Sequence, residues 1–276
     1  MTDTQPILIV GGGGKTGARV NTLLRKRAID TRPVSRSSDI PFDWAKRETW
    51  PSALNGVSKA YVTYQPDLAV DGAEDDIAEF SRIAREEGLE HAVLLSGRGE
   101  PGAQRAEAAL QESGVSWTNV RASWFNQNFS EGPFRDGVLA GELALPADPI
   151  PEPFIDADDI ADVVVAALTR DGHTNRLYEV TGPRALTFAE AVDEIANAAG
   201  RPVRYRQISA EEFVEQTRPY VPEDILNLLI ELFTVVLDGR NVEVMHGVEA
   251  ALGRKPADFT DYARRAAESG AWSIAG

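Results

Sequence analysis

The chain has 276 residues, a net charge of −15 and no cysteine. This length allows one large domain, or a domain with a smaller lobe. The absence of cysteine excludes disulfides, thiolate nucleophiles and cysteine-based metal sites, and no other metal-ligand spacing appears. The acidic balance argues against nucleic acid and anionic membranes as partners.

The N-terminal residues lack the basic and apolar segments of a secretion signal. The longest apolar stretch, residues 225–237, is interrupted by Asn227 and Glu231 and is too short to span a bilayer. We therefore expect a soluble cytoplasmic protein with no membrane partner.

A glycine-rich turn near the N-terminus is the strongest local signal. The apolar run 7–10 predicts a buried parallel strand, and a helical pattern begins near Ala18. Between them the glycines fit both G-x-G-x-x-G and the looser spacing of extended reductases, and we predict that they bind a pyrophosphate: Gly11, Gly12, Gly14 and Gly17. A P-loop is excluded because Ile9 stands where its first glycine belongs.

The end of the second predicted strand, residues 31–35, indicates which dinucleotide binds. An NAD enzyme would carry a carboxylate there for the ribose 2′-hydroxyl. This chain instead has one guanidinium and three hydroxyls, which suit a 2′-phosphate: Ser35, Arg36, Ser37 and Ser38. Asp39 lies too far along to replace the missing acid. The sequence therefore predicts NADP(H) as the cofactor.

Strands and helices alternate up to residue 121. Further strands are predicted at 40–44, 59–63, 91–96 and 115–120, with helices at 71–87 and 103–113. Asp43 and Trp44 end the first of these strands; they either contact the adenine or serve as an N-cap and a packed aromatic. Tyr64, Gln65 and Pro66 follow the second strand, and we assign them to the cofactor site.

The second half of the chain has a different pattern. Residues 130–153 read as loops with a possible short hairpin, 154–168 begin extended and become helical, and 176–181 form a strand. Capping boxes at Thr187 and Ser209 start helices, and further helices are predicted at 222–237, 243–252 and 258–269. We predict an α/β fold: a Rossmann-like doubly wound parallel sheet over 1–181, with an irregular insertion at 130–153, and a smaller, mostly helical C-terminal substrate lobe over 182–276.

Several segments together resemble the NmrA-like branch of atypical short-chain dehydrogenases and reductases. They are residues 11–17, 35–38, 42–44 with 48–50, 94–96, 120–129, 153–161 and 253–256. The similarity covers essentially the whole chain and is closest to the ergot-alkaloid reductases of the agroclavine and festuclavine dehydrogenase type. Arg121-Ala122-Ser123 departs from the usual Arg-Pro-Thr, so the relatives' substrate does not carry over.

The resemblance implies roles for individual residues. Gly11, Gly14, Lys15 and Thr16 would hold the pyrophosphate, and Ser35, Arg36 and Ser38 the 2′-phosphate. Ser96, at the end of the strand 91–96, would lie near the nicotinamide ribose and counts among the cofactor-binding residues. Trp124 and Phe125 would lie near the nicotinamide and the substrate.

The chain lacks the Tyr-x-x-x-Lys motif, whose tyrosine is the proton donor in typical short-chain dehydrogenases. No tyrosine has a lysine four residues later, and the predicted helix 103–113 contains no lysine. Arg105 is there, but its pKa is too high for a general acid. The isolated His91, His173 and His246 are interpreted as structural or exposed. Ser96 and Asn126 are therefore assigned orienting roles only, and apolar side chains are assigned to the substrate: Trp124, Phe125 and Phe129.

These observations predict an NADPH-dependent reductase that transfers hydride to a small electrophilic molecule, an imine or iminium of specialised metabolism. Such a substrate needs little acid catalysis. Two alternatives stay open: a quinone reductase, and a non-catalytic NAD(P) sensor of the NmrA type. The expected partner is a small-molecule substrate, with neither nucleic acid nor membrane, and the expected state is a monomer or homodimer.

Overall fold

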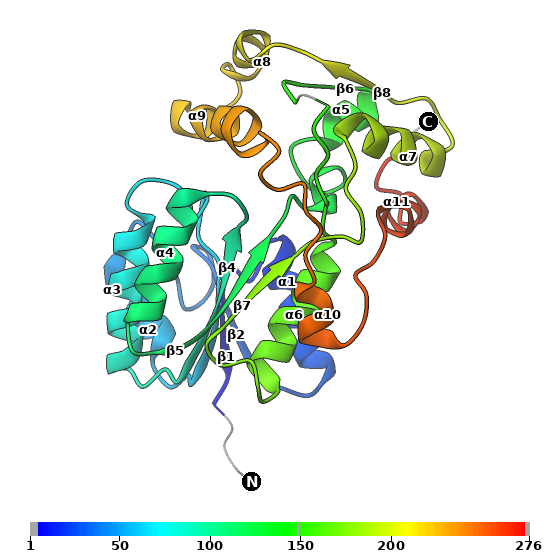
Figure 1. Cartoon of the computed structure of the whole chain (residues 1–276). Coiled ribbons are helices and arrows are strands. Elements are labelled where there is room, and N and C mark those ends of the chain that lie inside the picture. The colour runs from blue at the N-terminus through cyan, green and yellow to red at the C-terminus, as the bar shows by residue number, and fades with distance from the viewer. Residues whose placement is uncertain (1–4, 148, 274–276) are drawn as a thin grey trace. The chain divides into compact units, whose positions relative to one another are not determined.

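The computed structural model describes residues 5–147 and 149–273 (Figure 1). Contacts between residues divide the chain into two compact units. Unit 1 comprises residues 1–122, 157–180 and 246–254, and unit 2 comprises 123–156, 181–245 and 255–276. We predicted a single division near residue 181. The structure instead interleaves the two units along the chain, because each is completed by segments that lie far apart in sequence.

Unit 1 is a six-stranded parallel sheet with helices on both faces, which confirms the predicted Rossmann-like architecture. The sheet order is β2 (Thr31–Val34), β1 (Ile7–Val10), β3 (Lys59–Val62), β4 (His91–Gly97), β5 (Ser116–Ala122) and β7 (Arg176–Val180). One face carries α1 (Lys15–Lys26), α6 (Ala157–Thr169) and α10 (Gly247–Leu252). The other carries α2 (Trp50–Leu54), preceded by the 3₁₀ turn η1 (Arg47–Thr49), α3 (Ala73–Glu86) and α4 (Pro101–Glu112).

The strand predicted at 40–44 is wrong. These residues form turns and irregular backbone after β2. Pro41 cannot donate to a ladder, and Phe42 N–H bonds back to Ser35 O at 2.9 Å. The aromatic side chains enter the hydrophobic core instead: the Phe42 ring lies 5.0 Å from Trp44 and 6.0 Å from Trp50. Their apolar character thus reflects packing rather than strand formation.

Unit 2 contains mostly helices around an aromatic core. Its elements are η2 (Asn126–Asn128), α5 (Arg135–Ala140), β6 (Glu142–Leu145), α7 (Phe188–Ala199), β8 (Arg204–Gln207), α8 (Ala210–Thr217), α9 (Glu223–Glu231), the π-helical turn η3 (Leu232–Val236) and α11 (Phe259–Glu268). The predicted capping box is confirmed at Thr187, which exchanges hydrogen bonds with Glu190, and Ser209 Oγ accepts from Glu212 N–H at 3.1 Å.

The short hairpin suggested within 130–153 is wrong. Helix α5 ends at Gly141, whose φ of +87° suits glycine, and β6 follows. Strand β6 pairs in parallel with β8, with Glu142 opposite Arg204. The partner lies about 60 residues later in the chain, so no local pattern in 130–153 predicts the pairing. No helix among the described residues is both long and apolar enough to cross a membrane.

Candidate active site

The turn between β1 and α1 and the first turn of α1 together contain three glycines that the protein's own packing requires. A side chain at Gly11, where φ is +75°, would collide with the Thr63 hydroxyl. One at Gly12 would collide with Pro33, and one at Gly17 with the carbonyl oxygen of Gly11. These glycines allow β1, β2, β3 and α1 to approach closely. The fold therefore requires glycine at these three positions whether or not a ligand binds.

Gly13 and Gly14 are different because both are exposed, and Gly13 also faces open space. A Cβ at Gly13 would meet no atom within 4 Å, and one at Gly14 would meet only the Gly11 carbonyl oxygen, at 3.2 Å. Gly14 is the N-cap of α1, no side chain caps this end, and the first turn contains no acidic residue. Backbone N–H groups and the helix dipole therefore make this turn suitable for an anion. Sequence alone does not predict a role for Gly13, because position 13 is variable in both glycine spacings.

Lys15 and Thr16 begin α1. The Thr16 side chain is buried, and its hydroxyl accepts a hydrogen bond from the Tyr61 hydroxyl at 2.8 Å. This bond ties the first turn of α1 to β3, so the Thr16 side chain has a structural role. The backbone N–H of Thr16 is also available to a phosphate, since it lies in the first turn, where helical N–H groups have no intrahelical acceptor.

The segment after β2 contains a serine that is hydrogen-bonded within the turn, Ser38, and an arginine that is not, Arg36. Ser38 Oγ accepts from Ser35 N–H at 2.9 Å and lies 2.6 Å from Ile40 O, so it closes the turn. Ser35 Oγ and Ser37 Oγ lie 3.4 Å apart. The Arg36 side chain is exposed and forms no hydrogen bond or ion pair within the described part of the chain. Arg36 is thus free to bind an anion.

Trp44 has a packing role in the structure. Its side chain is buried against Tyr64 at 4.7 Å between ring centroids, and its indole N–H donates to Thr63 O at 3.0 Å. The Asp43 carboxylate accepts from Ala45 N–H at 3.2 Å, which organises the turn locally. A contact of either residue with adenine stays a prediction.

Tyr64, Gln65 and Pro66 follow β3, as the sequence analysis placed them, and the Gln65–Pro66 bond is cis. The Tyr64 hydroxyl donates to Asp76 of α3 at 2.7 Å. Burial, with the adjacent Asp76 carboxylate, raises the pKa of Tyr64 well above its ordinary value. Gln65 and Pro66 are exposed.

Ser96 lies at the carboxyl end of β4, where ligands bind in open α/β sheets. Its side chain is buried, and its hydroxyl has no hydrogen-bond partner among residues 5–147 and 149–273. Most buried polar groups in proteins are hydrogen-bonded. An unpartnered hydroxyl at this end of the sheet is therefore consistent with a ligand contact.

A buried ionic network lies beside this strand end, and the sequence analysis missed it. Arg121 of β5 binds both carboxylate oxygens of Glu107, from α4, and donates to Glu179 of β7 at 2.6 Å. Arg98, in the loop after β4, approaches Glu179 at 3.9 Å. Hydrogen bonds to Glu107 and Glu179 raise the pKa of Arg121 despite its burial. The network holds α4, β5 and β7 together and so keeps the strand ends fixed.

The remaining predicted site residues lie in unit 2, directly after β5. Trp124 is partly exposed, and its ring contacts those of Phe134, Phe188 and Phe233, at 6.1, 5.6 and 5.2 Å. Phe125 is also partly exposed, whereas Phe129 is fully buried in the aromatic core. Asn126 is fully buried, and both atoms of its amide lack a hydrogen-bond partner in the described chain.

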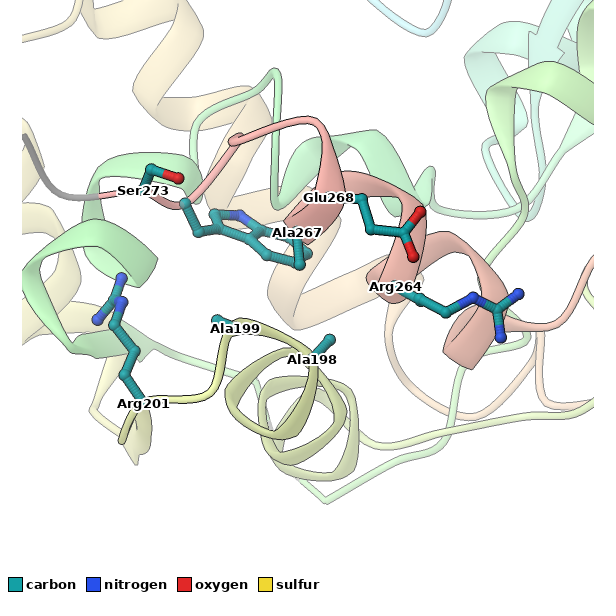
Figure 2. A pocket seen from close by; sticks show the side chains of 8 residues that line it. Ala198, Ala199, Arg201, Arg264, Ala267, Glu268 and Ser273 are labelled. Atoms are coloured by element: carbon teal, nitrogen blue, oxygen red, sulfur yellow. The ribbon is translucent and has the colours of Figure 1, made fainter.

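A pocket of about 610 Å³ lies elsewhere in unit 2, along α7 and α11 (Figure 2). It is lined by small side chains, by Trp272 and by three charged residues, Arg201, Arg264 and Glu268. Arg264 pairs with Asp261 at 2.7 Å, and Arg201 donates to Val138 O at 2.6 Å. None of the predicted site residues lines this pocket, so it is separate from the candidate site.

Comparison with known proteins gives the family. The NmrA-like family matches residues 104–263, which is more than half of the chain. The chain belongs to the NmrA-like family. An NAD(P)H azoreductase from Xenophilus azovorans is 32% identical over 94% of this chain and 96% of its own length. The festuclavine dehydrogenase of Aspergillus fumigatus is 27% identical over 94% of this chain and 97% of its own.

Solved structures agree on the fold. The NADPH-dependent quinone oxidoreductase of Escherichia coli, solved with NADPH, has a TM-score of 0.77 and 17% identity, covering 94% of this chain and 99% of its own. At this identity the likeness shows the fold alone. The predicted resemblance to the NmrA-like family and to its ergot-alkaloid reductases is confirmed.

Proposed function

We propose that this NmrA-like protein is an NADPH-dependent reductase that transfers hydride to a small electrophilic organic substrate. The observation that carries the proposal is the open anion site at Gly13 and Gly14, together with the unpaired Arg36 after the neighbouring strand β2. Relatives named as an NAD(P)H azoreductase and as a festuclavine dehydrogenase support the general activity. When bound, NADPH would supply the hydride.

The described residues fit this cofactor. The first turn of α1 offers backbone N–H groups and Lys15 to a pyrophosphate, and Arg36, with Ser35 and Ser37, offers donors to a 2′-phosphate. The Ser96 hydroxyl is buried without a partner at the end of β4, and we assign it to the nicotinamide ribose.

We further propose that the substrate is already electrophilic, an imine or iminium. Reduction of a neutral ketone develops alkoxide charge, which a positioned donor or an oxyanion site must stabilise. The two tyrosines in and directly after β3 are poor donors: Tyr61 is bound to Thr16 and Tyr64 to Asp76, and burial raises the pKa of both. Arg105 is an exposed arginine paired with Glu74. These observations support a reaction that takes no proton from the protein.

Trp124 and Phe125 are proposed to contact the substrate. Their partly exposed rings can cover a flat apolar molecule. Phe129 is buried behind Phe134 and Phe188, at 5.3 and 6.0 Å between ring centroids, so it would act by supporting the residues around it. Asn126 is proposed to orient the substrate through its unpartnered amide.

Two other functions compete with imine reduction. A quinone is also electrophilic and would suit the same apolar rings, and a regulatory NAD(P) sensor would need the cofactor site alone. NADPH oxidation measured with a panel of cyclic imines and quinones separates the three. Turnover of imines above quinones supports the proposal, whereas tight NADPH binding with no turnover of any acceptor supports the sensor.

A further inference from the structure

Two polar side chains directly after β5 are buried without hydrogen-bond partners. Ser123 is 3% exposed and Asn126 is 0% exposed. The Ser123 hydroxyl, the Asn126 amide nitrogen and the Asn126 amide oxygen all lack a partner in the chain as described, 5–147 and 149–273. Three unpartnered atoms within four consecutive residues are unusual, because most buried polar atoms are paired.

The backbone around these side chains is well fixed. Asn126 N–H donates to Ile155 O at 2.9 Å, and Ile155 N–H donates to Trp124 O at 2.9 Å. Phe129 N–H donates to Asn126 O at 3.0 Å and closes the 3₁₀ turn. These main-chain bonds fix the backbone around Asn126, while the hydrogen-bonding atoms of the Ser123 and Asn126 side chains are buried and unpaired. An apolar residue at position 126 would avoid the cost of burying an unpaired amide.

Trp124 lies between Ser123 and Asn126 in the sequence, and its ring adds an aromatic surface. Its indole N–H has no acceptor among the described residues, and its ring is backed by Phe233 and Phe134. A flat conjugated molecule can stack on such a ring, while its polar edge meets neighbouring donors and acceptors.

We propose that Ser123 and Asn126 form a polar anchor for a substrate edge that both accepts and donates a hydrogen bond, as a carboxamide or lactam does. The Asn126 amide N–H would donate to the carbonyl oxygen, and the Asn126 amide oxygen would accept the N–H. The Ser123 hydroxyl supplies a further bond to the same edge. This anchor rests on the proposed reductase function and narrows its substrate to planar molecules with an amide-type edge.

Ligands with one ring system and different edges test the anchor. 2-Naphthamide accepts and donates, 2-acetylnaphthalene only accepts, and 2-isopropenylnaphthalene does neither. Their affinities are measured by calorimetry for the full chain saturated with NADP⁺. We expect wild type to bind 2-naphthamide at least about tenfold more tightly than 2-isopropenylnaphthalene, since each added hydrogen bond contributes to that ratio. The methyl ketone should fall between them.

Three variants test whether the preference for 2-naphthamide over 2-isopropenylnaphthalene depends on Ser123 and Asn126. In Asn126→Leu the preference should shrink below about twofold, and in Ser123→Ala it should fall part of the way. Asn128→Leu is the matched control, because Asn128 lies in the same 3₁₀ turn but is partly exposed; its ratio should equal that of wild type. Asn126→Leu should also keep or raise the melting temperature, which a structural amide would not allow.

Equal ratios in wild type and Asn126→Leu would overturn the anchor, as would failure of all three ligands to bind. If Asn126→Leu lowered the melting temperature and left the affinity ratio of the two ligands unchanged, the Asn126 amide would instead bind an internal water. If Asn126→Leu does not fold, the ratio in Ser123→Ala decides in the same way. Imine turnover by wild type without any naphthamide preference would refute the anchor alone. Absence of turnover with every acceptor would refute the reductase function.

Discussion

Arg121 and Asn126 are close in sequence and carry buried polar groups, yet their surroundings differ. Arg121, in unit 1, makes three hydrogen bonds to Glu107 and Glu179, whereas the Asn126 side chain, in unit 2, makes none. The glycines show the same contrast, because packing requires Gly17 whereas Gly13 faces open space. Ser38 is hydrogen-bonded within its turn, whereas the Arg36 side chain has no partner among the described residues. We infer that, in these three pairs, the residue bonded or packed within the chain maintains the fold and the other residue binds a ligand.

The largest expected effect comes from breaking the Arg121 network. Arg121→Met would leave the Glu107 carboxylate, 2% exposed, without its partner. We expect the free energy of unfolding in urea to fall by about 3–5 kcal/mol, as for other broken buried pairs. The control is Arg105→Met, which breaks an exposed pair with Glu74 and should cost less than about 1 kcal/mol. Similar losses in the two variants would contradict this contrast.

Low pH should reduce the stability of the fold through a second group that is bonded within the chain, His91. His91 is buried, and its ring nitrogens lie 2.8 Å from Ser116 Oγ and 3.2 Å from Thr118 Oγ1. Burial, with the charges of Lys59 and His173, lowers the pKa of His91 to about 4. The unfolded chain binds this proton at a pKa of about 6.5. Stability is therefore complete above pH 6.5 and is lost as the pH falls towards 4.

The loss is on the order of 3 kcal/mol and is measured by urea unfolding between pH 7 and pH 4. His91→Gln should be less stable at pH 7 and should lose part of the pH dependence. His246→Gln, which removes a histidine that is 79% exposed, should behave as wild type. Identical pH slopes in wild type and His91→Gln would show that His91 is not the group responsible.

Arg36 tests an open group directly. Arg36→Ala should weaken NADPH binding by about 1.5–3 kcal/mol, the contribution of a hydrogen bond to a charged group, and leave NADH nearly unchanged. Calorimetric titration measures both ligands. Arg27→Ala removes another exposed cation, at the C-terminal end of α1, and is the control. Equal affinities of wild type for NADPH and NADH would refute the assignment of the 2′-phosphate site.

The two classes of glycine can be separated in the same titration. The Cβ of Gly13→Val would meet no protein atom within 4 Å, so the melting temperature should change little, whereas NADPH affinity should fall about 10- to 100-fold. Gly17→Ala should lower both, because its Cβ would collide with the Gly11 carbonyl. If Gly13→Val bound NADPH normally, the phosphate would not lie on this turn.

The smallest effect is expected at Ser96. If its hydroxyl only orients the bound molecules, Ser96→Ala should reduce kcat by less than about 100-fold, below the loss typical of a general acid. Steady-state kinetics with an imine measures the loss. A decrease near 10⁴-fold with NADPH affinity intact would identify Ser96 as part of a proton-transfer route.

The parts of the fold that sequence predicts are those determined by local pattern. The run Ile7–Val10, the glycines after it and the helix that follows define β1 and α1, because burial and backbone geometry act within a few residues. Residues 40–44 were misread because Phe42 and Trp44 face the core without belonging to a strand. The β6–β8 pair was missed because its partners lie far apart in sequence.

The candidate site shows the same limit. Arg36 and the glycine spacing were predicted from their positions after a strand, whereas Gly13 was passed over as a variable position. Neither the Arg121–Glu107–Glu179 network nor the unpartnered amide of Asn126 can be read from sequence, since both depend on which side chains meet in three dimensions. The sequence predicts an orienting role for Asn126, but at Ser123 it shows only a departure from the family pattern.

Deuteride transfer tests the central claim most directly. NADPH carrying two deuterium atoms at nicotinamide C4 is incubated with the wild-type protein and either N-methyl-3,4-dihydroisoquinolinium or 1-tetralone, two benzo-fused six-membered rings of similar size. The iminium needs no proton, whereas the ketone does. We predict one deuterium in the isoquinoline product, by mass spectrometry, and reduction of the ketone at least about 100-fold more slowly. Faster reduction of the ketone, or no deuterium in either product while NADPH binds tightly, would contradict the account.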